Sequence, residues 1–102
     1  MVRWMRSARI APGKFIETIG FATEIAEYVK KFEGLPPVQV FTDSFGDMTI
    51  IRWMVDYEDL ASLEKVTTQM MADQEYIEKV NSSADLFIPG TLNDVVMRLV
   101  GT

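Results

Sequence analysis

Apolar residues cluster in the stretch "DMTIIRWMVDYEDL", which covers residues 47–60, and they follow the two-residue period of a β-strand. Successive side chains of an extended strand point to opposite faces of a sheet. Ile51 and Trp53 then occupy one face of this stretch, and Ile50 and Met54 occupy the other. The pattern predicts a strand whose two faces are both shielded from water, so each face needs a covering layer.

The rest of the chain divides into segments of strand period and segments of helix period. Apolar residues at every second position predict strands, and apolar residues three or four positions apart predict helices. "APG" separates the first strand from the first helix, and "LPP" after Gly34 blocks continuation of that helix. The predicted elements are strands over residues 2–11, 38–43, 47–55 and 91–100, a helix over residues 14–32, and a second helix after Asp56.

The second helix has a predicted start and a predicted break. Asp56 is expected to cap it, because a side-chain oxygen there accepts N–H groups of the first turn. The segment "MMADQEYIEKVNSS" predicts a break near Asp73 followed by a restart. The element order is then β-α-β-β-α-β, which predicts a single α+β domain over residues 1–102 with a ferredoxin-like sandwich fold. Right-handed crossovers place both helices on one face of a four-stranded antiparallel sheet.

Strand alternation assigns side chains to the two faces of this sheet. The helix-facing set is predicted to be Met5, Ile51, Trp53, Val55, Val95, Met97 and Leu99. The opposite, open face is predicted to hold Trp4, Ala8, Ile10, Ile50, Met54, Val96 and Val100. Such an apolar face exceeds what monomers normally expose, so we expect a second copy of the chain to cover it and form a homodimer.

The run "IIRWMVDYEDL", the broken helix "MMADQEYIEKV" and the final strand after "FIPGT" resemble the dimeric α+β barrel superfamily. The similarity covers essentially the whole chain and is greatest to NIPSNAP-like domains and small antibiotic-biosynthesis-monooxygenase-like domains. The resemblance implies two ferredoxin-like sheets that dimerise into an α+β barrel, with a ligand held between sheet and helices. Fold alone does not select an activity in this superfamily.

Composition narrows the candidate chemistry. The 102 residues carry a net charge of −5 and include neither cysteine nor histidine. An acidic chain disfavours nucleic-acid binding, and the lack of histidine removes the usual general base, haem ligand and commonest zinc ligand. No run of about 20 apolar residues can span a bilayer, and no segment has the pattern of a signal peptide. We expect a cytoplasmic domain with no metal, no cofactor, and neither nucleic acid nor membrane as a partner.

Arg6, Arg52 and Arg98 lie near strand centres and all fall on the open face in the predicted register. A guanidinium fork suits a carboxylate or phosphate, so the three residues are a candidate anion site inside the dimer. The alternative is that each pairs across the dimer interface with Asp43, Asp56, Asp94 or a carboxylate of the second copy, because buried arginines are usually paired.

Aromatic and sulfur-containing side chains provide a second candidate site. Trp53, Tyr76, Phe15 and Met70 are expected to line an apolar pocket between sheet and helices, where the resemblance places a ligand. The alternative is a packed core, since such side chains fill cores more often than they form sites. Asp73 is the carboxylate expected near the pocket mouth, and its alternative role is the N-cap of the restarted helix.

The sequence identifies no catalytic residue and leaves several functions open. One is a homodimer that binds a small apolar or anionic ligand in the cavity. Another is a cofactor-independent monooxygenase or related enzyme acting on an aromatic or polyketide-like substrate, in which Asn81 or Asn93 polarises a carbonyl. A third is an interaction module. A polar-lined cavity favours the enzyme, an apolar cavity favours the binder, and a filled core favours the module.

Overall fold

β3 (Ile50–Tyr57) lies inside a four-stranded antiparallel sheet, between β1 (Val2–Arg9) and β2 (Gln39–Thr42). β4 (Asn93–Arg98) pairs with the other side of β1, so the strand order is β2-β3-β1-β4. These elements belong to a computed structural model that describes residues 1–101. The topology confirms the predicted ferredoxin-like α+β fold.

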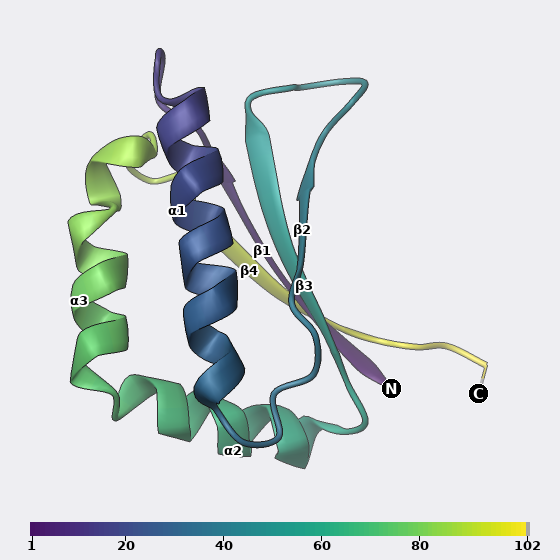
Figure 1. Ribbon diagram of the computed structural model, residues 1–102. Helices are drawn as coiled ribbons and strands as arrows, with labels where there is room; N and C mark the ends of the chain where they lie inside the picture. Colours follow the sequence, from purple (N-terminus) through teal and green to yellow (C-terminus); the bar gives the residue numbers. More distant parts are fainter. Residues whose placement is uncertain (102) are drawn as a thin grey trace.

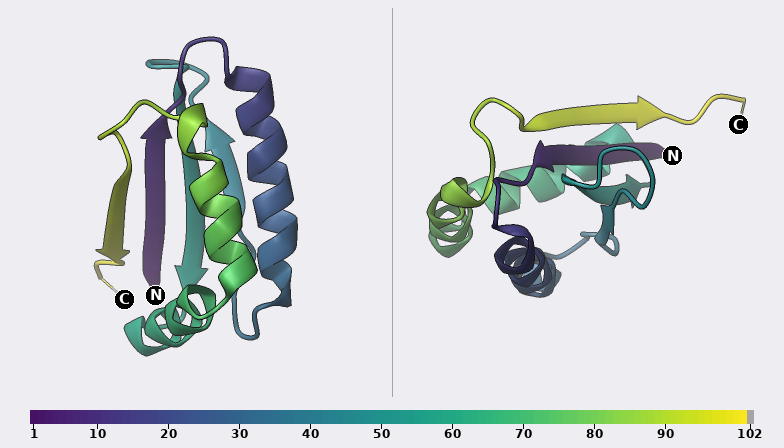
Figure 2. Two further views of the ribbon diagram at one scale, coloured as in Figure 1. Left: turned by 90° about the vertical axis from the view of Figure 1, so that its left-hand side faces the viewer. Right: turned by 90° about the horizontal axis from the view of Figure 1, so that it is seen from above.

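The helices form a second layer on one face of the sheet (Figure 1). The helical segments are α1 (Phe15–Tyr28), the 3-10 turn η1 (Val29–Lys31), α2 (Leu60–Met71), α3 (Gln74–Ser82) and the 3-10 turn η2 (Ala84–Leu86). α1 and α3 run side by side over the sheet, and α2 lies across one end of it (Figure 2). The predicted break in the second helix is confirmed as the junction between α2 and α3.

The second helix begins later than predicted. Asp59 caps α2, because its side chain accepts a hydrogen bond from the Ser62 backbone N–H at 2.8 Å. Asp56, the predicted cap, stays within β3 and accepts a hydrogen bond from Arg3 Nε at 2.7 Å. The assignment of Asp56 was wrong because the strand continues past it and a second aspartate, three residues on, is available for the cap.

The helix-facing side of β3 is as predicted. Ile51, Trp53 and Val55 expose 0%, 7% and 2% of their surfaces. Ala22 of α1 belongs to the same buried apolar cluster as Ile51 and Trp53. Burial of these alternate side chains against the helix layer is the hydrophobic basis of the two-layer fold.

β1 and β4 turn their side chains the opposite way to the prediction. Trp4 lies opposite Val55 on one side and Val96 on the other, and residues directly opposite in antiparallel strands share a face. The correction moves Trp4, Ala8, Ile10 and Val96 to the helix side and Met5, Val95 and Met97 to the open side. Leu99 and Val100 lie beyond the end of β4.

Arg6 explains why the face of β1 was misassigned. It shares a face with Trp4, and a charged side chain at that position argued against a core. Asp94 of β4 lies directly opposite Arg6 and accepts hydrogen bonds from its guanidinium at 2.7 and 2.8 Å. The pairing makes the charge tolerable on the helix side of the sheet.

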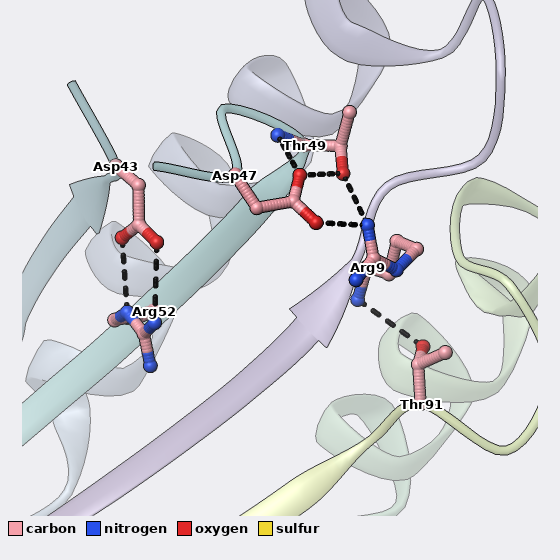
Figure 3. A network of polar contacts seen from close by, with 6 residues as sticks. All are labelled: Arg9, Asp43, Asp47, Thr49, Arg52 and Thr91. Atoms are coloured by element: carbon pink, nitrogen blue, oxygen red, sulfur yellow. Dashed lines mark hydrogen bonds and ion pairs between the residues drawn. The ribbon is translucent and has the colours of Figure 1, made fainter. Parts of the chain in front are cut away.

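The open face has an apolar centre bordered by ion pairs. Its apolar side chains, assigned by the strand register, are Met5, Phe41, Ile50, Met54, Val95 and Met97. Arg52 donates to both Asp43 carboxylate oxygens at 3.0 and 3.2 Å, and Arg9 pairs with Asp47 (Figure 3). None of the helices within residues 1–101 lies over this face (Figure 2).

Candidate functional site

A cavity of about 450 Å³ lies between the helix-facing side of the sheet and the helices. Trp4 of β1 and Trp53 and Val55 of β3 form part of its sheet wall, and Met70 of α2 and Tyr76 of α3 lie on its helix wall. Most of the lining is apolar or aromatic. Volume and lining are typical of small-molecule sites, which range from about 300 to 1,000 Å³.

The cavity exists because some apolar side chains of the helix layer pack against other helices and not against the sheet. Phe32, which follows η1, forms an apolar cluster with Ile25 and Val29, and Tyr76 and Val80 of α3 pack against that cluster. The rings of Phe32 and Tyr76 meet edge to face, with centroids 6.1 Å apart. Two other buried apolar clusters include sheet residues, one around Ile51 and Trp53 and one around Val55 and Tyr57. Residues of all three clusters line the cavity.

One side of the cavity reaches β4, which the helices leave uncovered. In the left view of Figure 2, no helix of the described chain lies in front of β4. Leu92 and Asp94, both exposed, line the cavity there, and Asn81 at the end of α3 lines it from the helix layer. The edge between α3 and β4 is therefore the route from solvent into the cavity.

Arg6 and Asp94 place an ion pair near this edge. Besides its contact with Asp94, the Arg6 guanidinium lies 5.4 Å from the centroid of the Trp4 ring, within range of a cation–π contact. Hydrogen bonding to Asp94 raises the pKa of Arg6 above its ordinary value, so the guanidinium stays charged. Burial raises the pKa of the neighbouring Tyr76 phenol, which is therefore neutral at pH 7.

Trp53, which lines the cavity, has an unsatisfied hydrogen-bond donor. Its indole Nε1 is buried and has no hydrogen-bond partner within residues 1–101. The ring contacts Phe87 edge to face, with centroids 6.1 Å apart. Buried polar groups are nearly always paired, and a small shift of this indole toward the cavity would let a ligand supply the acceptor that the described chain lacks.

The structure brings together three of the five predicted pocket residues. Trp53, Tyr76 and Met70 line the cavity. Phe15 does not, because it lies at the start of α1 and is 45% exposed, beside a separate shallow depression near Pro12. Its apolar character fits the helical stripe, but it is the first residue of α1, and the part of α1 that lines the cavity begins later, at Phe21.

Asp73 serves as a helix cap, which was its alternative role. Its carboxylate accepts hydrogen bonds at 2.8 Å from the Tyr76 backbone N–H and from the Tyr28 hydroxyl. Lys31 Nζ lies 2.7 Å from the other carboxylate oxygen. These contacts, led by the one to Lys31, lower the pKa of Asp73 to about 2. With its oxygens engaged in joining α1, η1 and α3, Asp73 does not line the cavity.

The three candidate arginines do not share a site. Arg6 lies on the helix side with Asp94, whereas Arg52 lies on the open face with Asp43. Arg98 sits on the helix side at the exposed end of β4, opposite Val2. The structure therefore does not bring the three arginines together on the open face, and Arg6 and Arg52 each pair with an aspartate of the same chain, not across a dimer interface.

Sequence reasoning missed Phe87 as a cavity residue, and its strand register placed Trp4 on the open face of the sheet. Phe87 lies in the connection before β4, where Ile10 pairs with it through an isolated bridge. The apolar alternation of Val2, Trp4 and Ala8 contained the signal for Trp4. No local pattern marks Phe87, because its position depends on a bridge to a residue far away in the sequence.

Two negative findings apply to the described chain. Residues 1–101 contain no group of three or more carboxylate, histidine or cysteine side chains placed to hold a metal ion. Within the same residues, no helix is both long enough and apolar enough to cross a bilayer.

The model of one protein family matches almost the entire sequence. The NIPSNAP family model aligns with residues 4–100. The chain belongs to the NIPSNAP family. No curated protein sequence gives a significant match to this NIPSNAP chain.

Solved structures share the fold of this NIPSNAP chain at low sequence identity. A NIPSNAP family protein of unknown function from Agrobacterium tumefaciens is 16% identical, with a TM-score of 0.77 over 97% of this chain and 87% of that one. An antibiotic biosynthesis monooxygenase is 17% identical, with a TM-score of 0.75 over 99% and 100% of the two chains. SnoaB, a cofactor-independent oxygenase from Streptomyces nogalater that was solved as a mutant, is 9% identical, with a TM-score of 0.74 over 99% and 94%. At these identities the similarity shows the fold alone.

Proposed function

We propose that this NIPSNAP domain is a homodimer that binds a small, mainly apolar molecule between the sheet and the helices. The observation that carries the proposal is a cavity of about 450 Å³ with a mainly apolar lining, one of whose residues, Trp53, has a buried indole N–H without a partner within residues 1–101. A bound molecule with a carbonyl or similar oxygen would accept the missing hydrogen bond. An unpaired buried donor costs about 1–3 kcal/mol, and a ligand acceptor would recover part of that cost.

The composition of the cavity wall supports a binder of apolar molecules. Trp4, Trp53 and Phe87 offer flat ring surfaces, and Met70 offers a flexible side chain that adapts to ligand shape. Such walls gain free energy mainly by removing apolar ligand surface from water, at about 25 cal/mol for each Å². Polar groups, including Tyr76, are few and would orient the ligand.

The homodimer is supported by the open face of the sheet. Phe41 and Met97 expose 45% and 38% of their surfaces there, beside the half-buried Met5, Ile50 and Met54. A second copy packed about a two-fold axis would cover this apolar centre. The ion pairs around it would stay at the rim, where charged side chains keep contact with water.

Native mass spectrometry of the purified protein tests both parts, because it reports subunit stoichiometry and any small molecule carried through purification. Titration with the neutral fluorescent probe N-phenyl-1-naphthylamine then measures cavity binding. We expect Val80→Trp, which places a large ring on the cavity wall, to abolish probe fluorescence. Ala61→Phe adds an aromatic ring to α2 outside the cavity and is the matched control. Equal probe binding by the wild type and Val80→Trp would contradict the proposed cavity.

A cofactor-independent monooxygenase acting on an aromatic substrate is the second candidate function. The specific observation in its favour is that Asn81 lines the same cavity as Trp53 and Tyr76. Its amide and the neutral phenol would donate hydrogen bonds to a substrate oxygen as negative charge develops there. Oxygen uptake with an aromatic, polyketide-like substrate, lost in Asn81→Ala, would support this function. Ligand binding without oxygen uptake would leave the binder as the function.

A further inference from the structure

The cavity contains one positive and one negative side chain, and each neutralises the other. Within the described chain, Arg6 and Asp94 are the only charged residues on the cavity wall. Nε and Nη2 of Arg6 donate to the two carboxylate oxygens of Asp94 at 2.7 and 2.8 Å. This is the bidentate geometry that a guanidinium would use to hold a ligand carboxylate. A carboxylate of the fold therefore already occupies the Nε–Nη2 edge of Arg6 and neutralises its charge.

We propose that Asp94 sets the charge of the ligand: by occupying Arg6, it makes the cavity a site for neutral molecules and excludes carboxylates. The inference rests on the proposed ligand-binding function and narrows its ligand class. The ligand is then a neutral molecule, largely aromatic, with an oxygen acceptor such as a ketone, quinone or ester carbonyl. Trp53 Nε1, brought to the cavity surface by a small shift of the indole, is the donor for that oxygen.

The electrostatics of the cavity favour this class. A carboxylate that enters the cavity loses water and finds no uncompensated cation on the wall, so its desolvation is not offset. The negative charge of Asp94 also repels it from the one guanidinium that suits it. A carbonyl group has a much smaller desolvation cost, and the indole N–H of Trp53 satisfies it with a single hydrogen bond.

The position of Arg6 makes exchange of partners costly. Its guanidinium is placed over the Trp4 ring, and Asp94 is fixed opposite it by the ladder between β1 and β4. To bind a ligand carboxylate through Nε and Nη2, Arg6 would have to release Asp94, and a carboxylate held by the remaining Nη1 would lie beside the negative charge of Asp94. The strand ladder fixes the backbones of Arg6 and Asp94 opposite each other, so Asp94 stays beside Arg6 and competes with any ligand carboxylate.

A pair of probes with the same ring system tests the proposal. Isothermal titration calorimetry measures the affinity of the purified protein for 2-acetonaphthone, a neutral ketone, and for 2-naphthoate, its anionic counterpart. We expect the wild type to bind the ketone at least about tenfold more tightly, within the range that separates a satisfied neutral group from an uncompensated charge. Asp94→Asn, which frees the guanidinium, should raise the affinity for naphthoate about tenfold, as expected for a charged hydrogen bond in a partly exposed site. Affinity for the ketone should change by less than about twofold, because Trp53 is its partner.

Two further variants separate this effect from a general change of charge or stability. Asp43→Asn removes the matched carboxylate partner of Arg52 on the open face, outside the cavity, and should leave both affinities unchanged. Arg6→Gln leaves Asp94 without its cation and should weaken naphthoate binding further, opposite in sign to Asp94→Asn. Thermal melts of each variant show that it is folded, and Arg6→Gln tests the sign even where Asp94→Asn is unstable.

The outcomes distinguish this proposal from the function on which it rests. Tighter binding of naphthoate than ketone by the wild type, or no gain in Asp94→Asn, would overturn the role of Asp94. Ketone binding that Val80→Trp abolishes would still support a ligand cavity in that case. Failure of both probes to bind any variant would contradict both the charge selection and the proposed cavity function.

Discussion

Trp53 combines two properties that rarely occur together: it exposes only 7% of its surface, yet its indole N–H is unpaired within residues 1–101. Truncation to alanine should therefore destabilise the protein by about 3–5 kcal/mol, the usual cost for a buried aromatic ring. Trp53→Phe should cost roughly 1–2 kcal/mol, because it removes ring area but no intramolecular hydrogen bond. Urea unfolding of both variants measures the difference.

The same unfolding experiment has a control and a contrary outcome. Trp4 lies on the same face of the sheet as Trp53, so Trp4→Ala should also destabilise the folded chain, with no added dependence on protein concentration. If Trp53→Phe costs as much free energy as Trp53→Ala, the indole N–H is paired in solution and the argument for a ligand acceptor fails.

At the scale of elements, Asp73 joins α3 to α1 and η1 through Tyr28, Lys31 and its own cap hydrogen bond. Its pKa is lowered from 3.8 to about 2, first by Lys31. A lowered folded-state pKa means that the stabilisation is fully present above pH 3.8 and is lost as the pH falls toward 2. Asp73→Asn should reduce the loss of stability over this interval, measured by urea unfolding followed by circular dichroism.

Glu64→Gln, on the exposed side of α2, controls for the removal of a carboxylate that does not cap α3. If Asp73→Asn keeps the full acid sensitivity of the wild type between pH 4 and about 2, then the contacts of Asp73 do not couple the helices as described.

Elements fixed by interactions between residues close in the sequence were predicted correctly, whereas features fixed by contacts between distant residues were not. The faces of β3 were predicted correctly, because its apolar alternation is local and only one face lacks a charged residue. The break at Asp73 was also predicted, since a helix cap is a local signal. The two faces of β1 were assigned the wrong way round, because Arg6 can lie on the helix side only through its pairing with Asp94, 88 residues away in the sequence. Phe87 was missed for the same reason: only the folded chain brings it to the cavity.

At the scale of the molecule, a substitution on the open face of the sheet tests the proposed homodimer. Met54 lies at its apolar centre, opposite Met5 on one side and Gln39 on the other. We expect Met54→Asp to dissociate the dimer, because an unpaired carboxylate would be buried in an apolar interface. Sedimentation equilibrium at micromolar concentration should give a dimer for the wild type and a monomer for the variant.

The matched control for this substitution is Ile16→Asp, which exchanges an apolar residue for aspartate on the outer side of α1, where Ile16 is 81% exposed. It should leave the dimer intact. Probe binding by the Met54→Asp monomer then tests whether the cavity needs the dimer. All its lining residues lie within one chain, so the monomer should keep its affinity for neutral ligands. Loss of probe binding on dissociation would mean that the second copy is needed to keep the cavity open between the sheet and the helix layer. A monomeric wild type would instead leave the apolar centre of the open face exposed to water, contrary to the proposed dimer.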